Sequence, residues 1–389
     1  MWVKRIEISG VGGIQELLLE FDDHINILCG PNGIGKTTIL ESVAHAFSAG
    51  QTTILKRHAK SESSKIDATV CVDSQDHTVV IVFKEFVPSQ HAQIHALHQL
   101  SAKLISLKVN RTLDYRPLNS IEKDTKKELP QTYAEARQGV SLADVKNWFV
   151  NRYLFSKHAN LSDSQFANYE LARSSFSALS KDFTFSRVDP STLEILVNSP
   201  SGEIYYEYLS SGFKSCLSII FGIIKELEFR FPSPGIVAGE FDGVVLIDEV
   251  ELHLHPEWQA TVLPVLSHKF PKAQFICSTH SPHVIQAAQR HQIIAIEGEQ
   301  GVVRQRPLPN SPFGFRGWTI EEVLVDVMGM SDLRTSEYRA ATRAFERAID
   351  SEDRVAAEES FKVLDEMLHP ESHLRKMFLL QLSAVAGVP

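Results

Sequence analysis

Two short stretches of the sequence contain residue types that could act together on a phosphate group. The first, "GPNGIGKT", runs from Gly30 to Thr37 and offers closely spaced backbone N–H groups, an ammonium group and a hydroxyl. The second, "IDEVELHLHP", covers residues 247–256 and places three acids and two histidines within eight positions. The second stretch is compatible with a metal site, an acid–base pair or a surface turn.

The first stretch matches the pattern G-x-x-x-x-G-K-[ST] of a phosphate-binding P-loop, in the context that this motif requires. It follows the apolar run 25–29, which predicts a buried strand, and precedes a helical pattern from Lys36 to about Phe47. Glycines let backbone N–H groups turn toward the phosphates, and the helix start adds its positive dipole end. A glycine turn that only by coincidence ends in Lys-Thr is the alternative, and it does not explain this context.

The motif predicts ATP and Mg²⁺ as cofactors. Lys36 is expected to contact the β and γ phosphates, Thr37 to offer its hydroxyl to Mg²⁺, and Thr38 to contact the α phosphate. The predicted nucleotide-binding residues of the loop are Gly30, Pro31, Asn32, Gly33, Ile34, Gly35, Lys36, Thr37 and Thr38.

The acidic stretch follows residues 244–247, an unbroken apolar run that predicts a buried strand. We expect this strand to lie beside the P-loop strand and to present Asp248 to Mg²⁺. Glu249, one residue further on, is then placed to polarise the attacking water as general base. A surface turn is disfavoured, because two adjacent acids at the end of a buried strand are costly without a cation.

The histidines give weaker signals. His253 and His255 are two positions apart, the wrong spacing for ligands on one helix face, so a zinc site is disfavoured and a role in the turn and a subunit contact is expected. His91, His95 and His98 have helical spacing, but no carboxylates stand at matching positions. For these three a solvated helix face is favoured over a metal site.

The elements that must position these residues indicate an α/β fold. Strand patterns at 3–8, 25–29, 66–72 and 78–83 open the chain, and they resume after 181, with a helix at 212–230 and buried strands at 244–248 and 274–278. Helical patterns at 90–103, 131–150 and 163–180 lie between the two halves. We therefore predict an ATPase core over 1–85 and 181–311, a mostly helical insert over 86–180, and a small helical domain over 312–389.

Two further motifs make the pattern specific. "EYLSSG" places Ser210, Ser211 and Gly212 at a helix start, and "CSTHSP" places His280 after the last buried strand. With the P-loop and the acids, the chain resembles ABC-superfamily ATPases of the branch that includes SMC, RecF and OLD-family proteins. The resemblance implies an ABC-type head with a mixed sheet and an ATP-sandwich homodimer.

The same resemblance implies roles for residues outside the P-loop. Ser210, Ser211 and Gly212 correspond to the signature motif, which caps the γ phosphate held by the opposite subunit. His280 corresponds to the switch histidine, and residues 251–256 to the D-loop that crosses the dimer interface. The signature "LSSGFKS" departs from the transporter form. Asn110 and Arg111 are the candidates for the Q-loop, and the alternative is that these two residues are a plain surface strand end.

The combination "DEVELHLHP…STHSP" with a short helical tail resembles ATPase subunits of bacterial anti-phage systems such as Septu, retron-linked and PARIS-type modules. This implies an ATP-hydrolysing sensor or scaffold that acts through a separate effector protein, expected to be a nuclease. About 75 residues follow Ser311, too few for a Toprim nuclease domain. The alternatives are a RecF-like DNA-repair ATPase and a scaffold that binds ATP with negligible hydrolysis.

The composition limits which other functional classes the protein can belong to. The 389 residues include 39 Lys and Arg against 48 Asp and Glu, and the net charge of −9 argues against nucleic-acid binding by the whole chain. Residues 103–127 contain seven basic side chains and three acidic ones, and this stretch is the candidate for DNA or RNA contact. Without a signal peptide or a long apolar segment, we expect a cytoplasmic protein without membrane contact. Four dispersed cysteines predict reduced thiols.

Overall fold

The computed structural model describes residues 1–109, 111, 115, 117–156, 161–299, 302–330 and 334–385. The chain divides into two compact units, Met1–Gly329 and Met330–Pro389. All residues predicted to do chemistry lie in the first unit.

A six-stranded mixed sheet forms the centre of the first unit. Its order is β15 (Val302–Gln305), β14 (Ile293–Glu299), β3 (Ile25–Cys29), β13 (Gln274–Ser278), β12 (Val244–Ile247) and β8 (Leu104–Leu107). The five strands from β14 to β8 are parallel, and β15 pairs antiparallel at the edge. β3, β12, β13 and β8 are buried along their whole length, which is why their sequences are apolar without alternation.

The prediction that the acidic strand lies beside the P-loop strand is wrong. β13 lies between them and pairs with β12 on one side and β3 on the other. Because the three strands are parallel, their carboxyl ends still meet at one edge of the sheet. The P-loop and Asp248 therefore approach each other across the end of β13.

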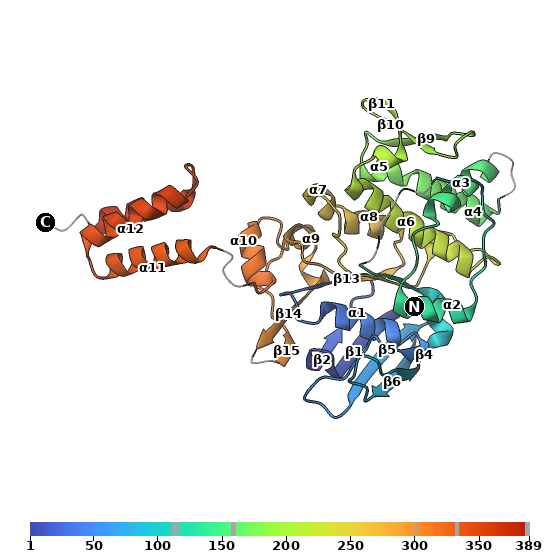
Figure 1. The fold of residues 1–389 in the computed structure, drawn as a ribbon, viewed down its shortest axis with the longest axis horizontal. Coiled ribbons are helices and arrows are strands. Elements are labelled where there is room, and N and C mark those ends of the chain that lie inside the picture. The colour runs from blue at the N-terminus through green and yellow to red at the C-terminus, as the bar shows by residue number, and fades with distance from the viewer. Residues whose placement is uncertain are drawn as a thin grey trace. The chain divides into compact units, whose positions relative to one another are not determined.

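An antiparallel sheet of order β2 (Ile14–Glu20), β1 (Trp2–Val11), β5 (Ser64–Val72) and β6 (Gln75–Phe83) forms a second layer. Helix α1 (Lys36–His45) lies between the two sheets (Figure 1), and its Ile39, Leu40 and Val43 join both in one apolar core. A two-stranded antiparallel sheet of β4 (Ala49–Thr52) and β7 (Ala92–His95) adjoins this layer. Burial on both faces fixes α1, and with it the P-loop that precedes it.

Helix α6 (Ser211–Arg230) packs against α3 (Val145–Ser156), α4 (Asp163–Arg173) and α5 (Ser175–Leu179) (Figure 1), and Arg230 at its end forms an ion pair with Glu135 of α2 (Leu129–Gln138). An aromatic cluster holds α3, α5 and α6 together. In it, Phe149 stacks on Phe221 at 4.9 Å between ring centroids, and Trp148 and Phe176 pack beside this pair. A three-stranded sheet of β9 (Thr184–Val188), β10 (Ile195–Ser199) and β11 (Gly202–Tyr205) leads into α6.

Several expectations for the predicted insert are wrong. The predicted helix over 90–103 is strand β7 followed by the 3-10 turn His98–Lys103. The predicted helix over 131–150 is divided into α2 and α3 at Gly139, which has φ 88°. The apolar run that begins at Leu104 is strand β8, so residues 86–180 contribute one strand to the central six-stranded sheet.

The first unit also contains α7 (Pro256–Gln259), α8 (Val262–Lys269), α9 (Pro282–Ala287) and α10 (Ile320–Glu322), with a π-helical turn at Val323–Val327. The remaining short turns are Tyr206–Tyr208, Ala238–Glu240 and Arg290–Gln292. Residues 312–329 belong to this unit rather than to the tail, because Phe315, Val323 and Val327 are buried and Gln286 bonds the Trp318 carbonyl.

The second unit is a helical hairpin with a third helix. It consists of α11 (Ser336–Asp350), α12 (Arg354–Met367) and α13 (His373–Val385) around Phe345, Ala348, Ala357 and Leu364. Over the residues that the structure describes, no helix combines the length and apolarity needed to cross a bilayer.

Candidate functional site

The P-loop connects β3 to α1 through three glycines with positive φ: Gly30 at 144°, Gly33 at 74° and Gly35 at 108°. Gly35 is the residue before the first turn of α1. A Cβ atom on Gly30 would lie 2.2 Å from the Ile296 carbonyl oxygen of β14, whereas one on Gly33 would meet nothing within 4 Å. The loop therefore packs its base on the sheet and leaves open space above Gly33.

Lys36 is 5% exposed and turns into the loop. Its ammonium group donates to the carbonyl oxygens of Gly30 at 2.9 Å and Pro31 at 3.0 Å. Burial lowers the pKa of Lys36, while the carboxylates of Glu251, Asp248 and Glu249 act in the opposite direction. Two carbonyl dipoles satisfy a cation only in part, so a phosphate oxygen is a better partner for this ammonium group.

Asp248 is buried at the point where β12, β13 and α1 meet. Its Oδ1 accepts from the Ser278 hydroxyl at 2.5 Å and from the Thr37 hydroxyl at 3.3 Å. Thr37 and Asp248 are 211 positions apart in the sequence. A carboxylate and a hydroxyl beside a P-loop are the hard oxygen ligands that Mg²⁺ prefers, so this set of donors fits the predicted ion.

Glu249 adopts φ 50°, a left-handed conformation that non-glycine residues seldom take. Its N–H donates to the Ser278 hydroxyl at 2.7 Å, so the same serine contacts both predicted acids. The conformation turns the chain sharply after β12. Glu249 is half-buried and follows Asp248 directly, as the expected general base must.

Arg111 is 5% exposed, so a surface strand end is wrong for this residue. Its guanidinium group donates to the carbonyl oxygens of Asp248 at 2.8 Å and Glu249 at 2.7 Å. Burial lowers the pKa of Arg111, and the neighbouring Asp248 carboxylate opposes this. The other Q-loop candidate, Asn110, lies outside the described residues.

His280 follows β13 and is partly buried. Its N–H donates to Glu251 Oε1 at 2.5 Å, and the Thr279 hydroxyl donates to Glu251 Oε2 at 2.7 Å. Burial, with the charge of Lys36 second, lowers the pKa of His280 and favours the neutral imidazole. Glu251 thus fixes the end of β13 to the turn after β12, a role that its position in the sequence alone did not indicate.

The signature residues lie at the start of α6. Ser210 caps the helix, its hydroxyl accepting from the Phe213 N–H at 3.2 Å, and both Ser210 and Ser211 are exposed. A Cβ on Gly212 would lie 3.2 Å from the His255 nitrogen and 3.4 Å from the His253 carbonyl oxygen. The signature helix therefore packs closely on the predicted D-loop, and His253 turns the chain with φ 65°.

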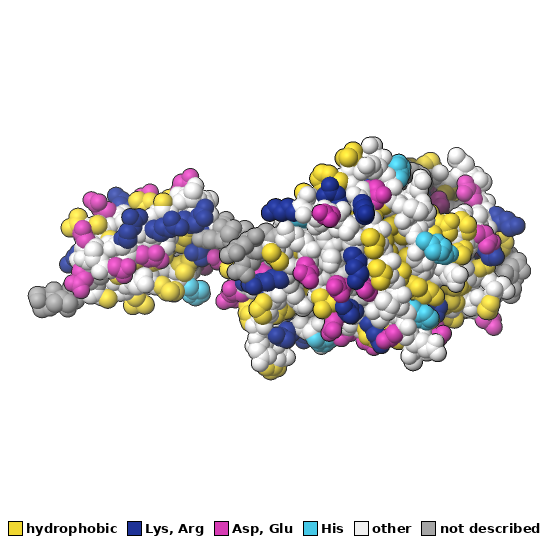
Figure 2. Space-filling view, turned by 90° about the horizontal axis from the view of Figure 1, so that it is seen from below, with side chains coloured by type: hydrophobic (Ala, Val, Ile, Leu, Met, Phe, Trp, Pro, Cys, Tyr) yellow, Lys and Arg dark blue, Asp and Glu magenta, His cyan; other side chains and the backbone are white. Residues whose placement is uncertain are grey.

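The basic stretch 103–127 is largely neutralised within the unit. Ion pairs join Lys103 to Asp242 at 3.0 Å, Lys108 to Glu41 at 2.7 Å, Lys126 to Glu128 at 3.0 Å and Lys127 to Glu226 at 2.7 Å. Arg116 and Asp114 lie outside the described residues. On the face of this unit shown in Figure 2, Lys and Arg side chains are interspersed with Asp and Glu. Neither observation favours DNA or RNA contact at this stretch.

The solvated helix face predicted for His91, His95 and His98 is wrong, because strand β7 and a 3-10 turn replace the predicted helix. His95 lies in β7 and His98 in the turn that follows, with ring centroids 4.8 Å apart. Within the part of the chain that the structure describes, no three His, Cys, Asp or Glu side chains are grouped to hold a metal ion.

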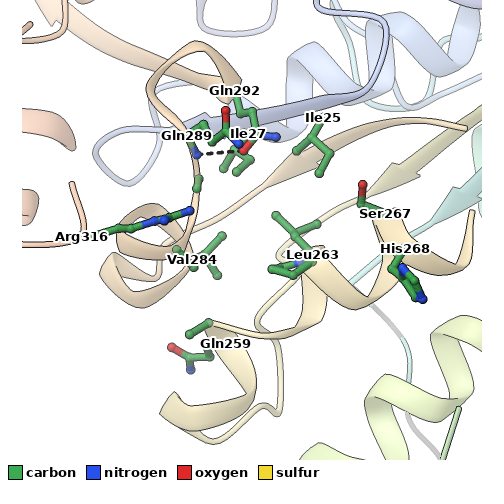
Figure 3. Close-up of a pocket in the computed structure, with 14 residues that line it drawn as sticks. Ile25, Ile27, Gln259, Leu263, Ser267, His268, Val284, Gln289, Gln292 and Arg316 are labelled. Carbon is green, nitrogen blue, oxygen red and sulfur yellow. Dashed lines mark hydrogen bonds between the residues drawn. The ribbon is translucent and has the colours of Figure 1, made fainter. Parts of the chain in front are cut away.

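A cavity of about 410 Å³ lies between α8, α9 and the start of β3 (Figure 3). Ile27, Leu263 and Val284 line its apolar part, and Gln292, which accepts from the Gln289 N–H at 2.8 Å, lines the polar part. None of the predicted site residues lines this cavity. It is separate from the P-loop.

Comparisons with known proteins identify relatives of this chain. A family model described as "AAA domain, putative AbiEii toxin, Type IV TA system" matches residues 87–286. The Septu protein PtuA of Bacillus thuringiensis is 41% identical over 392 residues, which cover 99% of this chain and 99% of that protein. The "Retron Vc95 probable ATPase" of Vibrio cholerae is 36% identical over 122 residues, 31% of this chain and 24% of that protein. The SMC head domain from Thermotoga maritima is 17% identical with a TM-score of 0.48, covering 80% of this chain and 100% of that one.

Proposed function

The chain belongs to the family of the Septu protein PtuA, SMC-like ATPases of bacterial anti-phage systems, and from this membership we propose that it binds Mg²⁺-ATP and hydrolyses it in ATP-sandwich homodimers. The hydrolysis cycle acts on a separate effector protein, for which a nuclease is the leading candidate. Thr37, Asp248 and Glu249 carry this proposal, because Asp248, which directly precedes Glu249, accepts from the hydroxyl of the P-loop residue Thr37, 211 positions away.

The residues divide the work by their chemistry. Lys36 exchanges its bonds to the Gly30 and Pro31 carbonyls for phosphate oxygens, and the P-loop N–H groups surround the phosphates. Thr37 and Asp248 hold Mg²⁺, which neutralises phosphate charge when bound. Glu249 accepts the proton of the attacking water, and His280 donates to the γ phosphate.

The dimer completes each site. Ser210 and Ser211 are exposed at the start of α6, where hydroxyls and backbone N–H groups form an anion site for the γ phosphate held by the partner subunit. Exposure of these polar groups beside the D-loop supports a role in trans. The same closed dimer is the state that the effector protein distinguishes from the open one.

Two substitutions test the assignment. Lys36→Ala removes the charge that meets the β and γ phosphates and should abolish ATP binding in calorimetry. Glu249→Gln should retain ATP binding and slow hydrolysis by about 100-fold or more, the scale of a positioned general base. Glu20→Gln, at an exposed position of β2, is the matched control and should behave as wild type.

Unchanged ATP affinity of Lys36→Ala would reject the P-loop assignment. Unchanged turnover of Glu249→Gln would place the base elsewhere if the wild-type protein is active. If the wild-type protein also hydrolyses ATP negligibly, the chain is an ATP-binding scaffold.

A further inference from the structure

Arg111 occupies a position that the roles assigned so far do not explain. It follows β8, is nearly fully buried, and directs two guanidinium nitrogens to the carbonyl oxygens of Asp248 and Glu249 at 2.8 and 2.7 Å. Its Nε has no hydrogen-bond partner among the described residues. A buried guanidinium group is strongly destabilising unless it is paired, so partners this close are required for its burial.

The two carbonyl groups belong to the turn that presents the proposed general base. Glu249 adopts φ 50°, and the left-handed region is strained for a residue with a Cβ atom. The turn therefore needs contacts that favour this conformation over the extended one. A charged, planar donor that bonds two successive carbonyl oxygens supplies them, because it fixes the orientation of both peptide groups.

The same short segment is attached to both halves of the site. The Leu107 carbonyl accepts from the Asp248 N–H at 2.9 Å, and Lys108 forms an ion pair with Glu41 of α1 at 2.7 Å. Arg111 adds its two bonds to the turn after β12. Leu107, Lys108 and Arg111 thus connect the P-loop helix to the turn that contains Glu249.

We propose that Arg111 is a positioning residue for ATP hydrolysis, which holds the Asp248–Glu249 turn in the left-handed conformation and so sets the place of the Glu249 carboxylate. This inference rests on the proposed function. Arg111 bonds the backbone of the turn and none of the P-loop residues, so it affects the chemical step much more than the affinity for ATP.

The expected kinetic effect is a loss of kcat at nearly constant KM. Arg111→Lys keeps the charge but not the planar pair of donors, and kcat should fall by about 10-fold. Arg111→Met fills a similar volume without charge, and kcat should fall by about 100-fold, approaching Glu249→Gln. The ATP dissociation constant of both variants should stay within about 3-fold of wild type.

Chemical rescue separates positioning from general loss of structure. In Arg111→Ala, millimolar guanidinium ion should restore part of kcat, because the free ion can bond the same two carbonyl oxygens. Urea, an uncharged molecule of similar shape, should restore less at equal concentration. Arg152→Ala is the matched control, since Arg152 is also buried but binds Glu228 and Asp124 among the helices, away from the P-loop.

Any of the following outcomes would overturn the inference. Wild-type kcat in Arg111→Met would show that the turn needs no such support. A fall in ATP affinity that matches the fall in kcat would show that Arg111 is only a stabilising residue. Equal rescue of Arg111→Ala and Arg152→Ala by guanidinium would show the same. If the wild-type protein does not hydrolyse ATP, the proposed function and this role are both rejected. If Glu249→Gln lowers kcat but the Arg111 variants keep the wild-type kcat, only the role of Arg111 is rejected.

Discussion

Gly30 and Gly33 both adopt positive φ in the P-loop, but only Gly30 is also pressed against another strand. A Cβ at Gly30 would overlap the Ile296 carbonyl oxygen at 2.2 Å, and that oxygen belongs to β14 and cannot move freely. A Cβ at Gly33 would enter open space, so its cost is the left-handed backbone alone. The two glycines of one motif are therefore required for different reasons.

Alanine substitutions measure this difference at the residue scale. Gly33→Ala should lower the free energy of unfolding by about 1–2 kcal/mol, the usual cost of left-handed backbone in a residue with a Cβ. Gly30→Ala should lower it by about 3 kcal/mol or more, because steric overlap adds to strain. Urea denaturation followed by circular dichroism measures both, and equal losses would contradict the contact with β14.

At the element scale, His45 joins the end of α1 to the two-stranded sheet of β4 and β7. It is fully buried, its Nδ1 lying 2.7 Å from the Glu41 carbonyl oxygen and its Nε2 3.0 Å from the Thr52 hydroxyl. Burial lowers the pKa of His45 from 6.5 to about 4. The folded state thus keeps this imidazole neutral where the unfolded chain binds a proton.

The buried, neutral His45 makes the free energy of unfolding depend on pH. Between pH 6.5 and about 4 the unfolded state binds more protons than the folded one, so stability is lost as the pH falls through this window. From pH 7 to pH 5, His45 should reduce the free energy of unfolding by about 2 kcal/mol. His45→Gln should remove that part of the loss in urea titrations, while His77→Gln, exposed on β6, should not. Equal pH dependence in all three proteins would contradict the neutral, buried imidazole.

At the scale of the whole molecule, the proposed dimer makes a prediction that no single chain can satisfy. Ser210→Arg blocks the signature but leaves the P-loop intact, and Lys36→Ala does the reverse. In a mixed dimer one site combines an intact P-loop with an intact signature. With free subunit exchange, half of the dimers are mixed and each has one such site, so about a quarter of wild-type ATPase activity should return.

The control for this mixture is a protein that carries both substitutions in one chain. Mixed with wild type, it leaves no heterodimer site with two intact parts, so it should add no activity. Subunit exchange is measured in parallel by energy transfer between labelled chains. Absence of recovery despite exchange would mean that each site is completed within one chain.

The sequence by itself determined the features that contiguous residues encode. The P-loop, the acids after an apolar run and the signature at a helix start each occupy a few successive positions, and the structure has strand β3, helix α1 and helix α6 within a residue or two of the predicted bounds. The α/β class followed from the same local patterns and the mixed sheet from the family resemblance, and both are confirmed. Local hydrophobic period and turn chemistry suffice for such features.

Only the tertiary structure decided which strands are neighbours and which charges are buried. β13 lies between the P-loop strand and the acidic strand, and β8 joins the core from within the predicted insert. Arg111 was one of two candidates at a strand end until its partners, 137 and 138 positions away, showed what it contacts. Strand order, buried charge and ion pairs depend on residues distant in the chain, and the pattern around a single residue carries no information about them.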